Sequence, residues 1–384
     1  MSSSDFDCLI IGRGIVGLAH ALAAVRQGLR TAVIDRETRA VGASVRNFGF
    51  VTVTGQQAGL TWRRARRTRE VWAELAPQTG IQVEQRGLLM IARRRESLAV
   101  IEEFADGPMG AGCRVLRGKA LAALAPPLRR RLPGALYSPH ELRVDSRDAL
   151  PRLAAWLTAA HEVTFLPRAN VLAIAPGRAE TSAGPIAARM IVVCPGPDVV
   201  TLFPAEFATR GVSLVKLHMM RLAAPGWRLP AAVMSDLGLL RYAGYADCPS
   251  LPALRGRVAT EQAPWLADGI HLIAVQGADG SLIVGDSHHI DPSPDPFQPR
   301  EVDDRILAEL GAVLDLPSPD VIERWVGVYP TGPEQAFAAA PAEGVRLVSV
   351  TSGTGASTAF AIAEETLADM LGRPVPAHAQ ESSP

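Results

Sequence analysis

The sequence has little lysine, little cysteine and no excess of either charge. Lys119 and Lys216 are its two lysines, so arginine carries nearly all of the positive charge, and 39 basic residues balance 39 acidic ones. A formal charge of zero predicts no nucleic-acid partner. The four cysteines are scattered without CxxC spacing, which favours reduced thiols and predicts no metal site.

Long apolar runs are missing as well. No run reaches the length that spans a bilayer, which predicts no membrane partner. The first motif begins a few residues after Met1, which leaves no room for a signal peptide. We therefore expect a cytoplasmic protein, and 384 residues are enough for two domains.

The stretch from Asp5 to Asp35 reads DFDCLIIGRGIVGLAHALAAVRQGLRTAVID. An apolar run, a glycine turn, a helical pattern and a second apolar run follow one another, which is typical of a βαβ dinucleotide-binding unit. Gly12 permits the tight turn, Gly14 lets the backbone approach a pyrophosphate, and Gly17 lets helix and strand pack closely. Asp35 lies 18 residues after Gly17, where a carboxylate accepts from ribose hydroxyls. An ordinary glycine turn is the alternative.

A second glycine-rich junction lies near the other end of the chain. A strand over 346–350 runs into Thr351–Thr358, and a helix follows to about Leu371. Both helix starts favour negative ligand groups, so together they can hold opposite ends of one extended ligand. NAD needs only the first junction, whereas a flavin dinucleotide uses both. An NAD-dependent dehydrogenase is therefore the alternative to a flavoprotein.

A predicted helix over 58–75 is rich in arginine. Its arginines suggest a nucleic-acid surface, but no aromatic platform accompanies them, so we favour a solvated helix face. A nucleic-acid-associated flavoprotein is the alternative from another functional class. The arginines of this helix are Arg63, Arg64, Arg66, Arg67 and Arg69.

The middle of the chain reads mainly as strands and turns. We expect strands over 163–174 and 213–222, further strands and turns over 228–245, and a hairpin turn over 278–281. Lys216 and His218 are two residues apart, so they share one side of their strand. The helix that ends near Ala160 tolerates Pro151 only in its first turn.

Several segments together resemble one family. They are GRGIVG (12–17) with Asp35, GASVRNFG (42–49), VVCPG (192–196), and RWVGVYP (324–330) with SGTGAST (352–358). They resemble the FAD-dependent amine oxidoreductases of the D-amino acid oxidase superfamily, which includes glycine oxidase and sarcosine oxidase. The resemblance covers nearly the whole chain. It implies an α/β fold with a Rossmann-type FAD-binding domain, as in glycine oxidase, and an interleaved α+β substrate domain built on an antiparallel sheet.

The resemblance also implies domain boundaries and a set of cofactor contacts. Residues 1–85, 140–210 and 320–384 would form the FAD-binding domain, 86–139 and 211–319 the substrate-binding domain, and 373–384 a flexible tail. Ser44 would offer its hydroxyl to the pyrophosphate, Val171 its backbone to the adenine, and the start of the last helix its N–H groups to the flavin. The implied cofactor-binding residues are Gly12, Gly14, Ile15, Val16, Gly17, Asp35, Arg36, Ser44, Arg46, Asn47, Phe48, Val171, Gly196, Thr354, Gly355, Ala356, Ser357 and Thr358.

Four positions depart from the family pattern. Gly327 replaces the cysteine that binds FAD covalently in sarcosine oxidase, which implies non-covalent FAD. Tyr329 replaces the arginine that grips the substrate carboxylate in glycine oxidase. Ser357 replaces a second cationic anchor, and Ile283 replaces a strand lysine that assists oxygen activation. These departures argue against ordinary α-amino-acid recognition and leave O2 and other electron acceptors open.

The segments SVRNFG, KLHMMRL, LLRYAGY, GDSH and WVGVYPTGPEQAF resemble a narrower subgroup, associated with the breakdown of phosphonates. The implied substrate is 2-aminoethylphosphonate or an N-alkyl derivative, and a dianionic phosphonate needs convergent cations. His218 is a further cationic candidate on its strand. The substrate-site residues that we expect are Arg46, Lys216, Arg241, Tyr242, His288 and Tyr329.

The expected reaction is oxidation of a primary or secondary amine. The amine binds neutral, hydride passes to flavin N5, and the resulting imine hydrolyses to an aldehyde plus ammonia or an alkylamine. An enzyme of the same fold acting on a glycine- or sarcosine-like amino acid is the nearest alternative. The sequence leaves the oligomeric state open.

Overall fold

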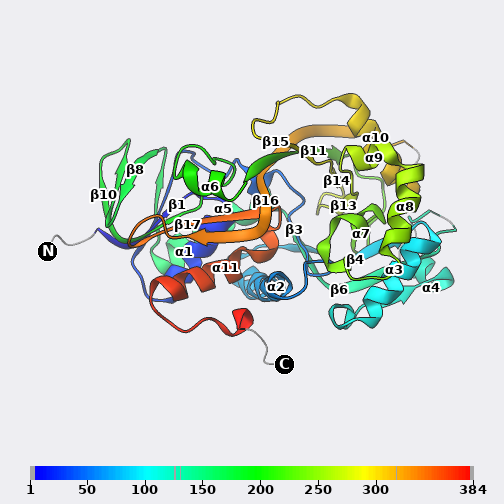
Figure 1. The fold of residues 1–384 in the computed structure, drawn as a ribbon, viewed down its shortest axis with the longest axis horizontal. Helices are drawn as coiled ribbons and strands as arrows, with labels where there is room; N and C mark the ends of the chain where they lie inside the picture. The colour runs from blue at the N-terminus through cyan, green and yellow to red at the C-terminus, as the bar shows by residue number, and fades with distance from the viewer. Residues whose placement is uncertain (1–4, 125–126, 130, 317, 381–384) are drawn as a thin grey trace.

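The first βαβ unit forms where the sequence predicts it. The computed structural model describes residues 5–124, 127–129, 131–316 and 318–380. Helix α1 (Ile15–Arg26) joins two neighbouring strands of a parallel sheet, which lies on the left in Figure 1. The strands of this sheet, in spatial order, are β7 (Thr164–Pro167), β2 (Thr31–Asp35), β1 (Phe6–Ile11), β10 (Ile186–Val193) and β17 (Val345–Ser352).

Within the part of the chain that the structure describes, four helices cover one face of this parallel sheet. Helix α1 packs against α11 and α5, and α11 packs against α2. Trp72 of α2 and Phe360 of α11 are buried with their ring centroids 5.1 Å apart, edge to face. Full burial of such a side chain contributes about 1.5–3 kcal/mol, so this apolar layer fixes the helix starts relative to the sheet. The further bounds are α2 (Leu60–Thr79), α5 (Ser146–His161) and α11 (Gly355–Met370).

A second sheet, largely antiparallel, lies on the right in Figure 1. Only the pairing of β12 with β4 is parallel among its described strands. In spatial order these are β5 (Arg114–Leu116), β6 (Gly134–Val144), β4 (Val83–Ala92), β12 (Ala232–Met234), β13 (Ile273–Gln276), β14 (Leu282–Gly285), β11 (Ser213–Leu222) and β16 (Val321–Ala339), with β3 (Phe50–Val51) beside β6 and β15 (His289–Asp291) beside β11.

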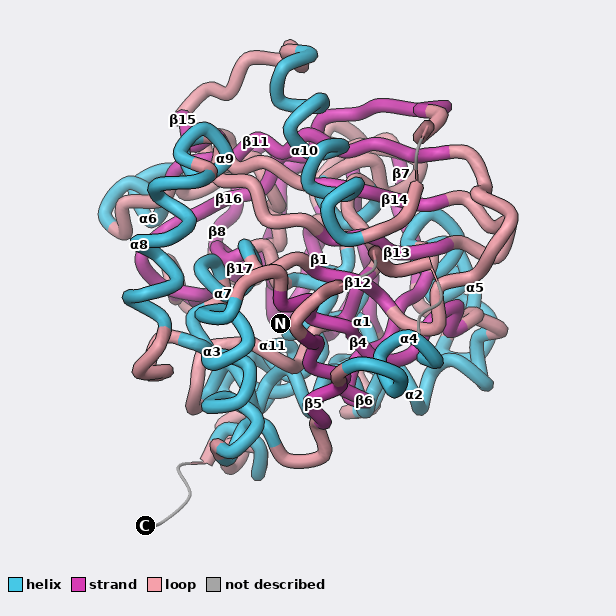
Figure 2. The backbone as a smooth tube through the Cα atoms, turned by 90° about the vertical axis from the view of Figure 1, so that its right-hand side faces the viewer, coloured by secondary structure: helices cyan, strands magenta, loops and turns pink. Residues whose placement is uncertain are grey.

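Helices surround the outer side of this second sheet, which faces the viewer in Figure 2. A hairpin and a short helix lie at the other end of the molecule. The outer helices are α3 (Arg95–Asp106), α4 (Gly118–Leu124), α7 (Leu237–Arg241), α8 (Leu251–Glu261), α9 (Ala263–Ala267) and α10 (Arg300–Val313). The hairpin is β8 (Val171–Ala175) with β9 (Arg178–Thr181), and the short helix is α6 (Pro204–Thr209).

Strand β16 connects the two sheets, as the long orange strand in Figure 1 shows. Its first part pairs with β11, and its second part pairs with β17 after a register shift between Thr331 and Ala336. Both sheets are built from segments far apart in the chain, which confirms the predicted interleaved α/β architecture. The implied boundary at 139/140 falls inside β6.

Three local predictions are wrong. Residues 237–241 form helix α7 instead of a strand. The strand expected over 163–174 is broken after Pro167, because Arg168 adopts a left-handed conformation with φ 60°. Helix α5 begins at Ser146, capped by Asp145, so Pro151 lies beyond the first turn and one backbone donor is missing inside the helix.

Part of the expected tail is packed onto the parallel-sheet half. The His378 carbonyl accepts a hydrogen bond from Arg63 Nε at 2.9 Å, and His378 Nε2 lies 3.1 Å from Glu365 Oε1. This contact lies in the short turn η4 (Ala377–Ala379). Residues 381–384 of the expected tail lie outside the described residues.

Candidate active site

The first glycine junction leaves no room for side chains. Gly12 has φ 103°, and a Cβ there would lie 2.2 Å from the Cys194 carbonyl oxygen. A Cβ on Gly17 would lie 1.9 Å from the Gly12 carbonyl oxygen, so close packing of α1 on the turn requires glycine at both positions.

The loop after β2 closes over this junction. Ser44, in the turn η1 (Ala43–Val45), accepts the Ile15 N–H at 2.9 Å and so caps α1. Its hydroxyl hydrogen stays available for a phosphate oxygen. Asp35 accepts the Arg13 N–H at 2.6 Å, which ties the end of β2 to the glycine turn.

The second junction is shaped by one aromatic ring. Gly353 has φ 73°, and a Cβ there would lie 2.7 Å from the ring of Tyr329. Thr354 precedes the first turn of α11, and the Ser357 hydroxyl accepts the Thr52 N–H at 2.8 Å. The N–H groups at the start of a helix have no intrahelical partner and present a positive dipole end.

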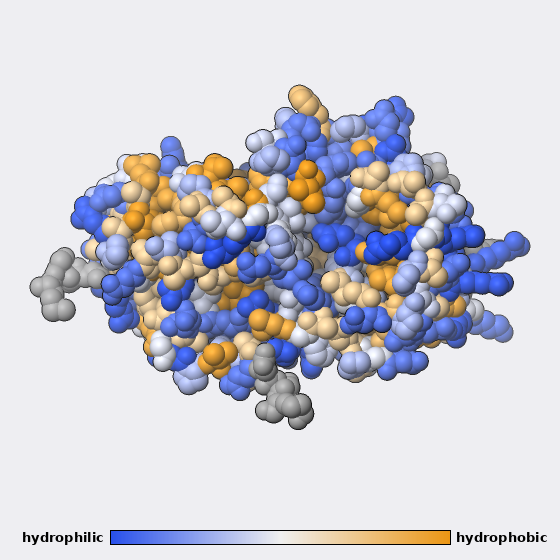
Figure 3. All heavy atoms as spheres, viewed as in Figure 1, coloured by the Kyte–Doolittle hydropathy of each residue, from blue (hydrophilic) through white to orange (hydrophobic). Residues whose placement is uncertain are grey.

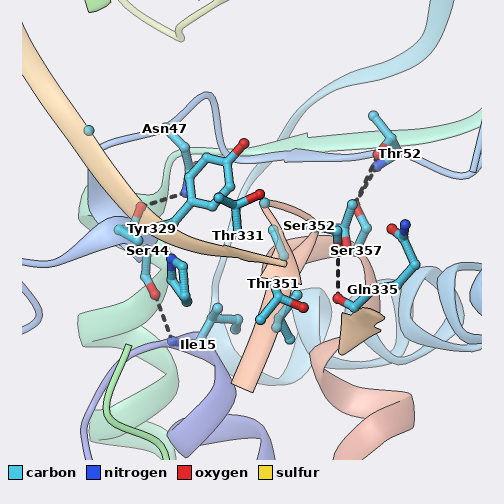
Figure 4. Close-up of a pocket in the computed structure, with 18 of the residues that line it drawn as sticks. Ile15, Ser44, Asn47, Thr52, Tyr329, Thr331, Gln335, Thr351, Ser352 and Ser357 are labelled. Atoms are coloured by element: carbon cyan, nitrogen blue, oxygen red, sulfur yellow. Dashed lines mark hydrogen bonds between the residues drawn. The ribbon is translucent and has the colours of Figure 1, made fainter. Parts of the chain in front are cut away.

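One cavity connects the two junctions, and the surface in Figure 3 is hollowed between the two halves of the molecule. Figure 4 shows Ser44 and Asn47 on one side of the cavity together with Tyr329 and Thr331 of β16. Thr52, Gln335, Ser352 and Ser357 gather on its other side. The expected cofactor residues that line it are Gly14, Ile15, Val16, Gly17, Ser44, Arg46, Asn47, Phe48, Gly196, Thr354, Gly355, Ala356 and Ser357.

The other expected cofactor residues do not line this cavity. Asp35 is the last residue of β2 and Val171 the first of β8, and Arg36 is paired with Asp198 at 2.9 Å. Gly12 acts through the turn, and the Thr358 hydroxyl donates to the Thr354 carbonyl inside α11. These residues are therefore placed to support the cavity or to extend it at the β2 end.

A flavin dinucleotide fits this arrangement of donors. The cavity presents two helix starts, glycines that keep the backbone open, and polar groups at both ends. Gly327 also lines it and has no nucleophilic side chain. The residues that would hold FAD are thus those of the two junctions and the η1 loop.

The antiparallel sheet closes the other side of the cavity with a polar cluster. Arg241 ends helix α7 and is exposed to the cavity, and Tyr242 follows it. The Tyr242 and His271 ring centroids are 5.6 Å apart, and those of His271 and His288 are 4.8 Å apart. The Tyr329 hydroxyl lies against Arg241, and burial nevertheless raises the pKa of Tyr329 to about 12.

Asp286 is the acidic member of this cluster. Burial raises its pKa to about 8, although the nearby Arg241 guanidinium opposes the shift. Burial, then Arg241, lowers the pKa of His288 to about 3, so this ring is neutral at pH 7. Among the described residues, His271, Asp286 and His288 form the one His/Asp group with ligand atoms within 4.8 Å of one another.

Lys216 lies outside the cavity, contrary to the expectation from sequence. Its ammonium pairs with Asp295 at 2.8 Å. His218 lies on the same side of β11 and contacts Asp303 at 3.1 Å. Leu217, between them, faces the cavity. The two residues do share one side of the strand, as predicted, but it is the side covered by α10 and the preceding loop.

Two further residues that were expected near the flavin, Ile283 and Arg46, lie differently from what the sequence suggested. Ile283 lines a separate hollow with Arg143 and Asp279, whereas Ile273 of β13 faces the cavity. Arg46 lies between the cavity and a neighbouring hollow, and its Nε donates to the Val41 carbonyl at 2.7 Å.

The arginines of α2 are mostly engaged within the protein. Arg64 binds Glu365 at 2.9 Å, and Arg67 binds Glu364 at 2.7 Å. Arg69 donates to the His140 carbonyl. The two ion pairs stabilise the packing of α2 on α11, and the Arg69 contact joins α2 to β6. Together they remove the observation that suggested a nucleic-acid surface. No described helix is long and apolar enough to cross a membrane.

A two-junction cavity between a Rossmann-type sheet and an antiparallel sheet defines a dinucleotide-dependent oxidoreductase. A family model described as FAD dependent oxidoreductase matches residues 7–370. The chain belongs to this family, and FAD is its cofactor. A sequence comparison with curated proteins found no match.

Solved structures share the fold over nearly the whole chain. Glycine oxidase from Bacillus cereus ATCC 14579 is 17% identical with a TM-score of 0.77, covering 96% of this chain and 95% of that one. L-proline dehydrogenase from P. horikoshii is 16% identical with a TM-score of 0.78, covering 97% and 95%. Iminodiacetate oxidase from Chelativorans sp. BNC1 is 22% identical with a TM-score of 0.71, covering 96% of each chain.

Proposed function

We propose that the protein oxidises a small amine that carries an anionic group, and that this amine is 2-aminoethylphosphonate or an N-alkyl derivative. The observation that carries the proposal is the position of Arg241. Its guanidinium is exposed to the same cavity that both helix starts line. A guanidinium presents a planar fork of donors that matches phosphonate oxygens, and Tyr242, Tyr329 and His288 add hydrogen-bonding groups beside it.

The roles of the chain follow from this placement. FAD held by the two junctions would supply the hydride acceptor for oxidation of the carbon next to the amine nitrogen. Water would convert the imine product to an aldehyde and release the nitrogen as ammonia or an alkylamine. Arg241 would hold the anionic end, so that this carbon is oriented toward the flavin. The N-terminus of α11 at Thr354–Ser357 would stabilise negative charge on the flavin ring.

A glycine- or sarcosine-like amino acid is the second candidate substrate. The names of two relatives, glycine oxidase and iminodiacetate oxidase, describe amines that carry carboxylates, and a guanidinium also binds a carboxylate. The phosphonate is favoured because Tyr329 replaces the arginine expected for an amino-acid carboxylate, while Arg241 comes from a different element.

Anaerobic reduction of the flavin tests the proposal. The FAD-loaded protein is mixed with 2-aminoethylphosphonate, its N-methyl derivative, glycine and sarcosine, and the loss of flavin absorbance is followed. Fast bleaching by an aminophosphonate at the lowest concentration supports the proposal. Bleaching by sarcosine or glycine alone replaces the substrate with an amino acid, and bleaching by none of the four overturns the proposed function.

A further inference from the structure

Asp286 lies between two histidines on the substrate side of the cavity. His271 Nε2 is 3.5 Å from Asp286 Oδ1, and His288 Nε2 is 3.9 Å from Asp286 Oδ2. The backbone fixes this arrangement. The His271 N–H donates to the Asp286 carbonyl at 3.3 Å, and the Asp286 N–H donates back to the His271 carbonyl at 3.4 Å. The His288 N–H donates to the Asp268 carbonyl at 2.8 Å.

When Asp286 is ionised, the group of Asp286, His271 and His288 has more hydrogen-bond acceptors than donors. His288 Nδ1 lies 3.1 Å from the Gly269 carbonyl oxygen, which only accepts, so Nδ1 carries the hydrogen of the neutral ring. The lone pair of His288 Nε2 then faces the Asp286 carboxylate. Asp286 Oδ1 and His271 Nδ1 are buried without a hydrogen-bond partner among the described residues. Asp286 also lines the cavity, so a ligand there that brings N–H donors meets its carboxylate from the cavity side.

The surrounding charges favour a monovalent cation. Burial is the main cause that lowers the pKa values of His271 and His288, and the Arg241 guanidinium of α7, which faces the cluster, lowers them further. Tyr242 and Tyr329 are neutral, since burial raises both pKa values. A divalent metal would meet the charge of Arg241 directly, whereas an ammonium brings one charge and several N–H donors.

We propose that Asp286, flanked by His271 and His288, binds the ammonium group of the substrate and takes its proton before hydride transfer. This inference rests on the proposed function. In the step an N–H bond of the ammonium breaks and an O–H bond forms on the Asp286 carboxylate, and no electrons are transferred. The nitrogen lone pair set free is the one that hydride transfer needs. An alkylammonium with a pKa of about 10.4 leaves roughly one molecule in 2,500 neutral at pH 7.

The pH dependence of flavin reduction distinguishes this role from a structural one. The productive complex has lost one proton, so kcat/KM should rise tenfold per pH unit up to about 8, the raised pKa of Asp286, and then level off. In Asp286→Asn the amine must lose its proton to solvent, and the rising limb should move to about pH 10. At pH 7 the variant should be slower by about 100-fold or more.

The experiment uses the FAD-loaded protein and anaerobic rapid mixing with N-methyl-2-aminoethylphosphonate from pH 6 to about pH 10.5. Asp304→Asn, on the exposed side of α10, is the matched control and should keep the pH dependence of kcat/KM of the unmodified protein. Propylphosphonate lacks the amine, so Asp286→Asn should not weaken its binding, measured by perturbation of the flavin spectrum. Both results together support the proposal.

Three results would overturn it. One is a kcat/KM that falls by the same factor at every pH, so that the profile still levels off near pH 8. Another is a loss of affinity for propylphosphonate as large as the loss of rate. The third is a stoichiometric divalent metal in the purified protein that Asp286→Asn removes. If Asp286→Asn fails to hold FAD, the test uses Asp286→Glu. A kcat/KM that still levels off near pH 8 in this variant supports the role of Asp286, and a rise that continues to pH 10 refutes it. If only sarcosine bleaches the flavin, the phosphonate proposal fails, and the same pH series with sarcosine still tests Asp286.

Discussion

Replacing Arg241 with alanine should weaken anion binding without releasing FAD. The side chain faces the substrate side of the cavity, and the two glycine junctions lie on other elements. Truncation of one partner of a hydrogen-bonded charge pair costs about 2–5 kcal/mol. Because Arg241 is exposed to the cavity, and hence hydrated before binding, we take the lower part of this range. A loss of about 2–3 kcal/mol corresponds to a 30- to 150-fold weaker Kd.

The assay is a titration of the oxidised flavin spectrum with propylphosphonate, together with kcat/KM from anaerobic reduction by the aminophosphonate. Arg241→Lys keeps the charge but loses the fork of donors, so it should fall between the unmodified protein and Arg241→Ala. Arg300→Ala, on the exposed start of α10, serves as the control. An unchanged Kd in Arg241→Ala with full FAD content would refute the assignment of the anion site.

Two further predictions concern FAD retention and acid stability. Gly17→Ala should lower the FAD-to-protein ratio and the Tm, because its Cβ would lie 1.9 Å from the Gly12 carbonyl oxygen. Gly256→Ala in α8, where a Cβ meets nothing within 4 Å, should keep FAD and gain up to about 1 kcal/mol. Burial opposes the shift, but hydrogen bonds from His378 and Arg64 lower the pKa of Glu365. Glu365→Gln should therefore cost about 1–2 kcal/mol at pH 7 by urea unfolding, and the difference should vanish as pH falls through the lowered pKa.

One result for each variant would contradict these two predictions. Full FAD content in Gly17→Ala would show that α1 can move away from the turn without loss of the cofactor site. For Glu365→Gln, the stability contribution is present above the ordinary carboxyl pKa and lost below the folded one. A difference from the unmodified protein that stays the same at pH 7 and at acid pH would show that the pairing with Arg64 does not stabilise α2 on α11.

The two glycine junctions were predictable because each is encoded by the spacing of glycines within a short stretch of sequence. Gly12 and Gly353 adopt left-handed φ values of 103° and 73°, and Gly17 packs against Gly12 in the same turn, so the glycine spacing before each helical pattern is enough to indicate the turns. The placement of Lys216 was not predictable in the same way. Strand β11 is covered on both faces, as the buried run from Val215 to Met220 shows, so alternation alone cannot tell which face meets the cavity.

The polar cluster was found only in part from sequence. His288 was expected at the site from the GDSH segment, but Asp286 in the same segment and His271 were not. His271 precedes β13, and it meets Asp286 only through the pairing of β13 with β14. Its sequence context, HLIAVQ, reads as a buried strand and carries no separate sign of chemistry. Arg241 was expected on a strand, whereas the five-residue helix α7 brings it to the cavity.

The most direct test of the account is a crystal structure of the protein with FAD and propylphosphonate. We predict the flavin ring beside Gly355 at the start of α11, without a bond to Gly327, and the phosphonate on the Arg241 guanidinium. A flavin ring away from Gly355, or a phosphonate held elsewhere in the cavity, would contradict it.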